Sequence, residues 1–383
     1  SLTVNSPSNN SNWNTNDVNV NASVSDSNNV SVFSDYGLVS WWRMDDLNSS
    51  GGVVDYMGLN NGTITNAVQV DGGYFGKGFA FDGEGDYVDL GEGDNMVENI
   101  TGLSVSAWVK SSLVAAKDEH DYVFGQVNVA YLRWHNSDNY YFAVVNGTGT
   151  TGTAVSSVYT DTNWRHIVGV YNGTNVLIYV NGVSEDATPG AVTGRLATDA
   201  NNLYIGAYAA DTSEWNGSID DVMIYNRTLS ANEIQAMYAN ASAKYLNASV
   251  GMAEGTRDVT VYSQDVGGNV VSLTSYNVSV DLSSPTVSVV SPLNATYNSS
   301  SVLVNVSSSE EGTGMIVGSL DNSLVSWWRM DDANATSVED YVGSNNGSIV
   351  NAVQTDAGKF GKGFAFDGDG DYVNLGTPSS LSN

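Results

Sequence analysis

The sequence repeats itself with a period of about 285 residues, and this repeat restricts the architecture more than any other feature. The nine letters LVSWWRMDD occur at 38–46 and return at 324–332. The stretch DYMGLNNGTITNAVQ at 55–69 corresponds to DYVGSNNGSIVNAVQ at 340–354. The chain therefore contains one whole unit and about 98 residues of the next. Such tandem units are typical of repeat proteins whose length is set by repeat number.

Short alternating strands dominate the aromatic part of the unit. Val176, Ile178 and Val180 are expected on one face of a strand, because side chains alternate along it. One helix is predicted at 231–238, where Ser230 is a natural N-cap and Glu233 completes a capping box. With more than ten expected strands, the block indicates a two-sheet jelly roll. The strands expected with most regular alternation are 103–109, 166–172, 175–182, 202–208 and 220–226.

Two flanking segments have a different, less aromatic pattern of alternation. They resemble immunoglobulin-like repeats of archaeal and bacterial surface proteins, through SPSNNSNWN at 6–14, EGTRDVTVY at 254–262 and DVGGN at 265–269. The last of these also reads as a hairpin. We expect one immunoglobulin-like sandwich, residues 1–37 plus 240–282, that carries the aromatic block 38–239 in a loop. A string of separate domains is the alternative, although 43 residues without cysteine bury a poor core.

The aromatic block resembles the concanavalin A-like, laminin-G-like jelly-roll family. The motifs that carry the resemblance are WWRMDD, FGKGFAFDGEGDYVDLG, NWRHIVGVYNGTNVLIYVNG and GSIDDVMIYNRTLSANEIQAMY. The predicted fold class is all-β: a laminin-G-like jelly-roll sandwich plus an immunoglobulin-like β-sandwich in a tandem unit. Residues 283–323 and 324–383 then begin the next sandwich and the next jelly roll.

Composition excludes several classes of function. The net charge is −29, with 42 acidic and 13 basic residues, so there is no basic footprint for nucleic acid. No apolar run is long enough to span a membrane, and no signal peptide is visible. The absence of cysteine excludes disulfides and thiolate metal sites.

The chain has 18 N-x-S/T sequons, which favours an extracellular or cell-surface glycoprotein. Asn, Ser and Thr are also ordinary turn residues, which is the alternative explanation. The sequons proposed as glycosylation sites are Asn21, Asn61, Asn146, Asn172, Asn216, Asn226, Asn247, Asn294, Asn305 and Asn346.

No catalytic residue is predicted, and the chain is not expected to be an enzyme. Glu84, Asp86 and Asp89 nearly match the carboxylate spacing of glucanases on the same fold, but Glu84 lies between glycines, as in a turn. The second copy replaces Asp89 by Asn374, which cannot act as nucleophile or acid. His166 falls inside a strand motif and is expected to be structural.

Calcium is the predicted cofactor, in a structural role. Asp82, Glu84 and Asp86 copy only the start of an EF-hand loop, so a Gly-rich hairpin tip is favoured there. In the resembled family a calcium ion often ties the first strand to the last. Carried over, that implies a site at Asp45, Asp46, Asp55, Asn60, Asp220 and Asp221. The alternative is that these acids cap strands and accept backbone hydrogen bonds.

Two functions follow from these features. The favoured one is a structural fibre or filament of the cell surface, whose partners are copies of itself and whose subunits exchange strands. The second is a lectin-like adhesin that binds glycans through loop aromatics, since aromatic rings stack on sugar faces. Packing in the core or at its rim is the alternative role for those aromatics, which are Trp134, Tyr140, Tyr208 and Trp215.

Overall fold

The computed structural model describes residues 1–26, 29–93, 96–112, 120–185, 190–210, 213–238, 245–299, 301–309, 315, 324–356 and 358–377. The chain divides into two compact units, which are described separately. The first unit comprises 1–7, 19–250 and 259–275, and the second comprises 8–18, 251–258 and 276–383. The predicted boundary at 239–240 lies outside the described residues.

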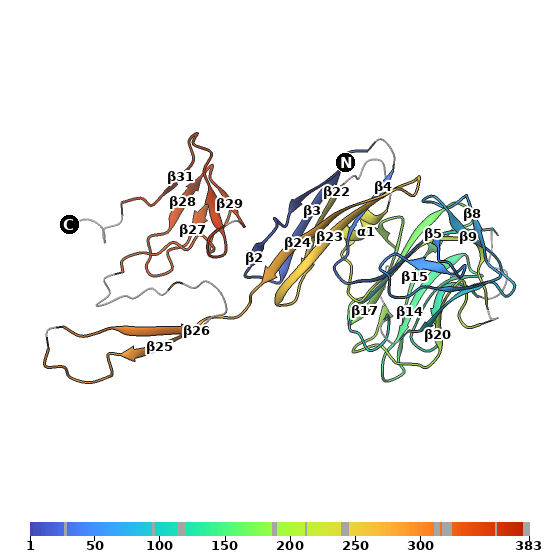
Figure 1. Cartoon of the computed structure of the whole chain (residues 1–383), viewed down its shortest axis with the longest axis horizontal. Coiled ribbons are helices and arrows are strands. Elements are labelled where there is room, and N and C mark those ends of the chain that lie inside the picture. The colour runs from blue at the N-terminus through green and yellow to red at the C-terminus, as the bar shows by residue number, and fades with distance from the viewer. Residues whose placement is uncertain are drawn as a thin grey trace. The chain divides into compact units, whose positions relative to one another are not determined.

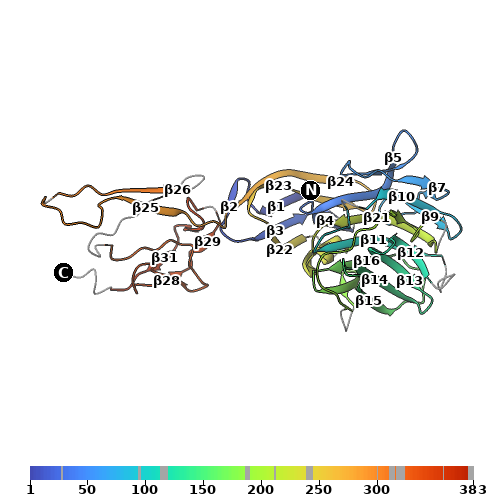
Figure 2. The same ribbon diagram turned by 90° about the horizontal axis from the view of Figure 1, so that it is seen from below.

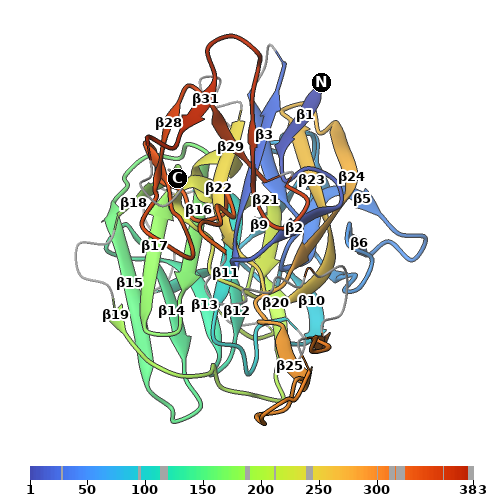
Figure 3. The ribbon, with the colours of Figure 1, turned by 90° about the vertical axis from the view of Figure 1, so that its left-hand side faces the viewer.

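The aromatic block forms two antiparallel sheets, which confirms the all-β fold class (Figure 1). The seven-stranded sheet has the order β15-β14-β13-β12-β20-β10-β7. Its strands β12 to β15 lie side by side in Figure 3. The strand bounds are β7 Thr63–Thr65, β10 Tyr87–Glu92, β12 His120–Gln126, β13 Ala130–His135, β14 Asn139–Val145, β15 Thr151–Val158 and β20 Asn202–Ile205.

The ten-stranded sheet has the order β18-β17-β16-β11-β21-β5-β6, with β19 paired to β17 and β9 joining β8 to β21. The regular strands predicted from the sequence all occur, with ends shifted by a few residues. The bounds are β5 Leu38–Leu47, β6 Val53–Asp55, β8 Val68–Val70, β9 Gly78–Asp82, β11 Leu103–Ser111, β16 Arg165–Tyr171, β17 Asn175–Val180, β18 Val183–Ser184, β19 Gly190–Ala191 and β21 Asn216–Tyr225.

Each face of the ten-stranded sheet is apolar. Val176, Ile178 and Val180 belong to the core between the two sheets, as their alternation predicted. Trp41 and Trp42 point to opposite faces of β5, and both are fully buried. A strand whose two faces are both apolar must be covered on both sides.

The face of the ten-stranded sheet that points away from the seven-stranded sheet is covered by a helix of the aromatic block and by two strands of the flanking segments. Helix α1 (Ala231–Met237) has the predicted capping box, with Ser230 and Glu233 bonded reciprocally. Strand β4 (Val30–Ser34) contributes Phe33, and β23 (Gly255–Asp265) contributes Tyr262. The ring of Phe33 lies edge-on to Trp41 at 5.0 Å, and it stacks on Tyr262 at 5.6 Å.

Strands from before and after the jelly roll share sheets. Phe33 on β4 pairs with Tyr262 on β23, and β24 (Val270–Val280) continues that sheet to β2 (Ser11–Trp13). The turn between β23 and β24 is the predicted hairpin, with Gly268 N donating to Asp265 O. A three-stranded sheet combines β1 (Leu2–Ser6), β3 (Asp17–Val24) and β22 (Tyr245–Gly251) (Figure 2).

The second copy forms the same local scaffold as the first. Asp340 Oδ1 accepts a hydrogen bond from Trp327 N at 2.9 Å, as Asp55 Oδ1 does from Trp41 N at 2.8 Å. Phe366 in this second copy is 54% exposed. Strand exchange stays a prediction. The strands of this part are β25 Thr286–Ser291, β26 Asn305–Ser309, β27 Ser337–Val338, β28 Gly347–Val350, β29 Val353–Thr355, β30 Gly363–Ala365 and β31 Tyr372–Asn374.

Among the described residues, no helix has both the length and the apolar character that crossing a membrane requires.

Candidate functional site

The outer face of the seven-stranded sheet carries a cluster of tyrosines around one arginine. Because side chains alternate along a strand, Leu132 enters the core while Tyr131 and Arg133 point outward. Cross-strand pairing sets Arg133 between Tyr122 on β12 and Tyr141 on β14. We call Tyr122, Tyr131, Arg133, Tyr141 and Tyr208 the tyrosine platform.

The rings of the platform contact one another. Tyr122 stacks on Tyr208 with ring centroids 4.7 Å apart, and Tyr131 lies edge-on to both, at 5.4 and 5.7 Å. Tyr122 is buried beneath the others, whereas Tyr131, Tyr141 and Tyr208 stay partly exposed. The platform thus presents aromatic surface to solvent on a rigid sheet, which suits recognition of a flat, partly apolar ligand.

A glycine allows the loop that carries Tyr208 to pack against the platform strands. Gly125 on β12 lies beneath the loop that follows β20, and a Cβ there would come within 3.0 Å of Ala207 O and Tyr208 Cα. A Cβ this close would be tightly crowded, so glycine lets the loop approach the sheet without displacing its neighbours. Gly125 thereby allows Tyr208, in the loop after β20, to stack on Tyr122 of β12.

Arg133 is held by tyrosines. Its guanidinium carbon lies 5.7, 5.1 and 5.3 Å from the ring centroids of Tyr122, Tyr131 and Tyr141. One terminal nitrogen donates to the Tyr122 hydroxyl at 3.2 Å, while Nε has no hydrogen-bond partner. Burial raises the pKa of Tyr122 and Tyr131, although the charge of Arg133 acts to lower it, so both hydroxyls remain protonated at neutral pH.

Three of the four aromatics predicted to stack on glycans are core residues, and for them the prediction is wrong. Trp134 and Tyr140 are each 1% exposed, and Trp215 is completely buried. Strand alternation turns Trp134 inward, where its ring lies 6.3 Å from those of Tyr140 and Trp215. Tyr208, the fourth, belongs to the platform. The alternation of AYLRWH at 130–135 is the signal that could have revealed Tyr131 and Arg133.

The predicted calcium ligands do not form one group. The two oxygens of Asp55 accept hydrogen bonds from four backbone N–H groups, those of Trp41, Met57, Leu59 and Asn60. The Asn60 side chain donates to Ser40 Oγ at 2.7 Å. Asp55 therefore organises its loop as a cap, and its lone pairs are already engaged.

Asp45 and Asp46 are also engaged. Arg43 forms ion pairs with both, at 2.9 and 3.0 Å, and the second oxygen of Asp45 accepts from Lys77 N at 2.8 Å. Burial raises the pKa of Asp45, although the hydrogen bond from Lys77 and the charge of Arg43 oppose this. A bound cation would have to displace the guanidinium group.

Asp220 and Asp221 are adjacent buried carboxyls on β21. Asp220 accepts from Phe75 N and Asp221 N, and Asp221 accepts from Trp41 Nε1 at 2.6 Å and Gln264 Nε2 at 3.1 Å. Burial raises the pKa of Asp220 well above its ordinary value, with a further rise from the charge of Asp221. Burial likewise raises the pKa of Asp221 to about 8.

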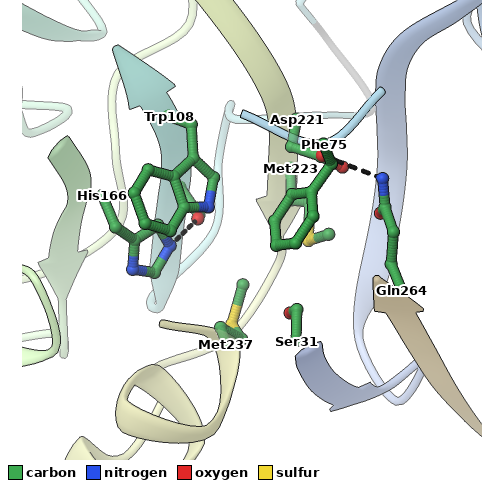
Figure 4. Close-up of a pocket in the computed structure, with 9 residues that line it drawn as sticks. Ser31, Phe75, Trp108, His166, Asp221, Met223, Met237 and Gln264 are labelled. Carbon is green, nitrogen blue, oxygen red and sulfur yellow. Dashed lines mark hydrogen bonds between the residues drawn. The ribbon is translucent and has the colours of Figure 1, made fainter. Parts of the chain in front are cut away.

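A cavity of about 10 Å³ lies beside Asp221 (Figure 4), which is enough for one water molecule. His166 lines it and shares a 2.7 Å hydrogen bond with Ser106. Burial lowers the pKa of His166 to about 3, so the ring is neutral. The lining residues are Ser31, Phe75, Ser106, Trp108, His166, Asp221, Met223, Met237 and Gln264.

Across the described ranges, no group of three or more acidic or histidine side chains is placed to hold a metal ion. The six predicted residues do not fit a calcium site as arranged, since their carboxylates already accept hydrogen bonds or form ion pairs. Calcium itself stays a prediction, for which the Discussion gives a test.

The acidic stretch that resembles glucanase and EF-hand patterns links the two sheets. Glu84 lies in the turn between β9 and β10, as expected, but these strands belong to different sheets and form no hairpin. Asp86 accepts from Asp82 N at 2.8 Å, and Asp89 accepts from the Asn202 side chain. These carboxylates stabilise the turn and its neighbouring strands.

The proposed glycosylation sites differ in access. Asn146 is 7% exposed and its Nδ2 donates to Thr193 O, so glycosylation there is incompatible with this fold. Asn216 Nδ2 is likewise bonded, to Asp82 O at 2.7 Å, and Asn21 is partly buried. The exposed asparagines are Asn61, Asn172, Asn226, Asn247, Asn294, Asn305 and Asn346.

The two antiparallel sheets form a jelly-roll β-sandwich. Residues 82–235 match the family model described as the concanavalin A-like lectin/glucanases superfamily. No match was found among curated proteins.

Three solved structures are similar to this chain at low identity. Domain 4 of AbnA, an extracellular arabinanase from Geobacillus stearothermophilus in complex with arabinotriose, is 22% identical with a TM-score of 0.39, over 53% of this chain and 98% of that one. The botulinum neurotoxin serotype D ligand binding domain with N-acetylneuraminic acid is 16% identical, with a TM-score of 0.41, over 53% and 50%. Trypanosoma rangeli sialidase is 16% identical, with a TM-score of 0.40, over 53% and 33%.

Proposed function

We propose that this protein is a carbohydrate-binding protein of the cell surface or extracellular space, and that the tyrosine platform binds the sugar. The observation that carries the proposal is the contact cluster of Tyr122, Tyr131 and Tyr208 on the outer face of the seven-stranded sheet. Sugar rings present apolar C–H faces that pack on aromatic rings, and flanking hydroxyl and guanidinium donors fix their orientation.

The position of the platform supports this role. The outer face of the ten-stranded sheet packs against α1, β4 and β23, through residues such as Phe33 and Ile234. The platform side chains Tyr131, Tyr141 and Tyr208 instead remain partly exposed. Exposed sequons such as Asn172 and Asn226 are compatible with an extracellular location. The expected absence of enzymatic activity stays a prediction.

A glycan array tests the proposal. Wild-type protein is compared with Tyr131→Ala and Tyr208→Ala, and Tyr245→Ala is the matched control because Tyr245 is an exposed tyrosine on β22, outside the jelly roll. We expect each platform variant to lose at least about tenfold in affinity, or about 1.4 kcal/mol. The control is expected to bind as wild type does. Equal binding by all four proteins would remove the platform as the site.

The filament role stays a prediction of the repeat. Negative-stain electron microscopy of native material, with and without a calcium chelator, tests it. Long periodic fibres would show that copies of the chain associate, and isolated monomers would exclude the filament. Either result is compatible with glycan binding by the platform.

A further inference from the structure

We propose that the platform selects sugars that carry a carboxylate, such as uronic or sialic acids, and that Arg133 binds this carboxylate. The inference rests on the proposed function and narrows its ligand class. It follows from the surroundings of Arg133, which differ from those of the four arginines that pair with carboxylates and of Arg195 and Arg257, which donate to backbone carbonyls.

Arginines in this protein commonly pair with carboxylates. Arg43 pairs with Asp45 and Asp46, and Arg227 pairs with the buried Glu233 at 2.6 Å. Arg165 pairs with Asp161, and Arg329 pairs with Asp331 and Asp332. The pairing is expected in a chain with 42 acidic and 13 basic residues.

Arg133 differs. Within the described ranges it forms no ion pair, and tyrosine rings lie around its guanidinium group instead. The backbone of Glu214 pairs with that of Tyr122, but among the described residues the Glu214 carboxylate forms no ion pair with Arg133. In the part of the chain that the structure describes, this cation on a partly exposed face lies among neutral rings and has no carboxylate partner.

The chemistry of Arg133 suits a carboxylate ligand. Guanidinium is planar and offers parallel N–H donors that match a carboxylate, and partial removal from water strengthens such charge-assisted hydrogen bonds. The rings of Tyr122, Tyr131 and Tyr141 surround it and fix its orientation. Tyr131 also contacts Tyr208, so one sugar can stack on a ring while its carboxylate reaches Arg133.

Because the protein is strongly acidic, it needs a local positive charge if it is to bind an acidic sugar. A net charge of −29 repels acidic ligands at long range. An acidic sugar therefore gains from this surface only where a specific cation offsets that repulsion. A neutral sugar has no such requirement, so Arg133 would contribute selectivity more than general affinity.

Matched ligand pairs test the inference on the full chain. The probes are oligogalacturonate with its methyl ester, and a sialylated glycan with its asialo form, measured by array and calorimetry. The proteins are wild type, Arg133→Gln, Arg133→Lys and Tyr131→Ala. Arg195→Gln is the control, because Arg195 is an exposed arginine that donates to a backbone carbonyl, Asn99 O.

For at least one pair, we expect wild type to bind the acidic member about tenfold tighter or more. Arg133→Gln should lose this preference and keep the neutral affinity, Arg133→Lys should keep part of it, and Arg195→Gln should match wild type. Tyr131→Ala should weaken both members. Equal binding of both members by wild type, or a preference that survives in Arg133→Gln, overturns the inference and leaves the proposed function. Binding to no member overturns both.

Discussion

The indole Nε1 of Trp41 donates a 2.6 Å hydrogen bond to Oδ1 of Asp221, a residue 180 positions later in the chain. Trp41 lies on the first strand of the jelly roll and Asp221 on its last. The other carboxyl oxygen accepts from Gln264 on β23, a strand that follows the jelly roll. One buried carboxyl group thus joins β5 and β21 of the jelly roll to β23.

This arrangement makes stability depend on pH. Since burial raises the pKa of Asp221 from 3.8 to about 8, the folded protein holds this proton more tightly than the unfolded chain does. The contribution of Asp221 to the free energy of unfolding is therefore fully present below about pH 4 and falls as the pH rises toward 8. The slope is up to about 1.4 kcal/mol per pH unit for this group.

Asp221→Asn should flatten the dependence, because an amide is neutral at every pH and still accepts from Trp41. Gln264 Oε1 has no hydrogen-bond partner in the described structure. If the side-chain amide of Gln264 rotates by half a turn, this oxygen can accept from Nδ2 of the new asparagine. Urea unfolding at pH 5 and pH 8 measures this, with the 54% exposed carboxylate of Asp46 changed to Asn as control. An unchanged slope in Asp221→Asn would contradict the role of this carboxyl.

Substitution of a core aromatic should lower stability, whereas substitution of a platform aromatic should lower glycan binding. Trp215→Ala removes a fully buried ring and should lower the free energy of unfolding by about 3–5 kcal/mol. Tyr131→Ala should change stability by about 1 kcal/mol or less and affect glycan binding instead. Thermal melts and array binding of the same preparations compare the two. A Trp215→Ala protein that keeps its stability and loses only binding would return Trp215 to the site.

Local rules in the sequence predicted most of the jelly roll. The Ser230–Glu233 capping box and the alternation of Val176, Ile178 and Val180 are set by neighbours in the chain, and both occur. The prediction of the glycan site was wrong for residues whose burial depends on tertiary contacts. Trp215 follows a loop and precedes β21, so alternation could not show that its ring enters the core.

The platform depends on a contact that no local pattern reveals. Tyr208 reaches Tyr122 only because β20 pairs with β12, 80 residues earlier, and because Gly125 admits the loop. The residue types of the predicted calcium ligands suit a metal, but Asp55 and Asp220 accept backbone N–H groups that only the folded chain brings to them.

Asp55 should be one of the most sensitive polar positions. Four backbone N–H groups donate to its carboxylate, and Asp55→Ala leaves them without this acceptor. We expect a loss of about 2–4 kcal/mol in urea unfolding. Asp55→Asn keeps one acceptor oxygen, so its loss should be roughly half as large. A cost below about 1 kcal/mol for the alanine variant would mean that water replaces the carboxylate.

Calcium should leave the stability of the jelly roll nearly unchanged. Asp45 and Asp46 are paired with Arg43, and Asp220 accepts two backbone N–H groups, so a cation would have to break these contacts before it gained ligands. We expect melting temperatures in about 5 mM calcium and about 5 mM EDTA to agree within about 1 °C. A saturated site at a hundred times its dissociation constant would instead add about 2.7 kcal/mol. A rise above about 5 °C that is lost in Asp45→Asn, but kept in Asp17→Asn on β3, would restore the predicted calcium site.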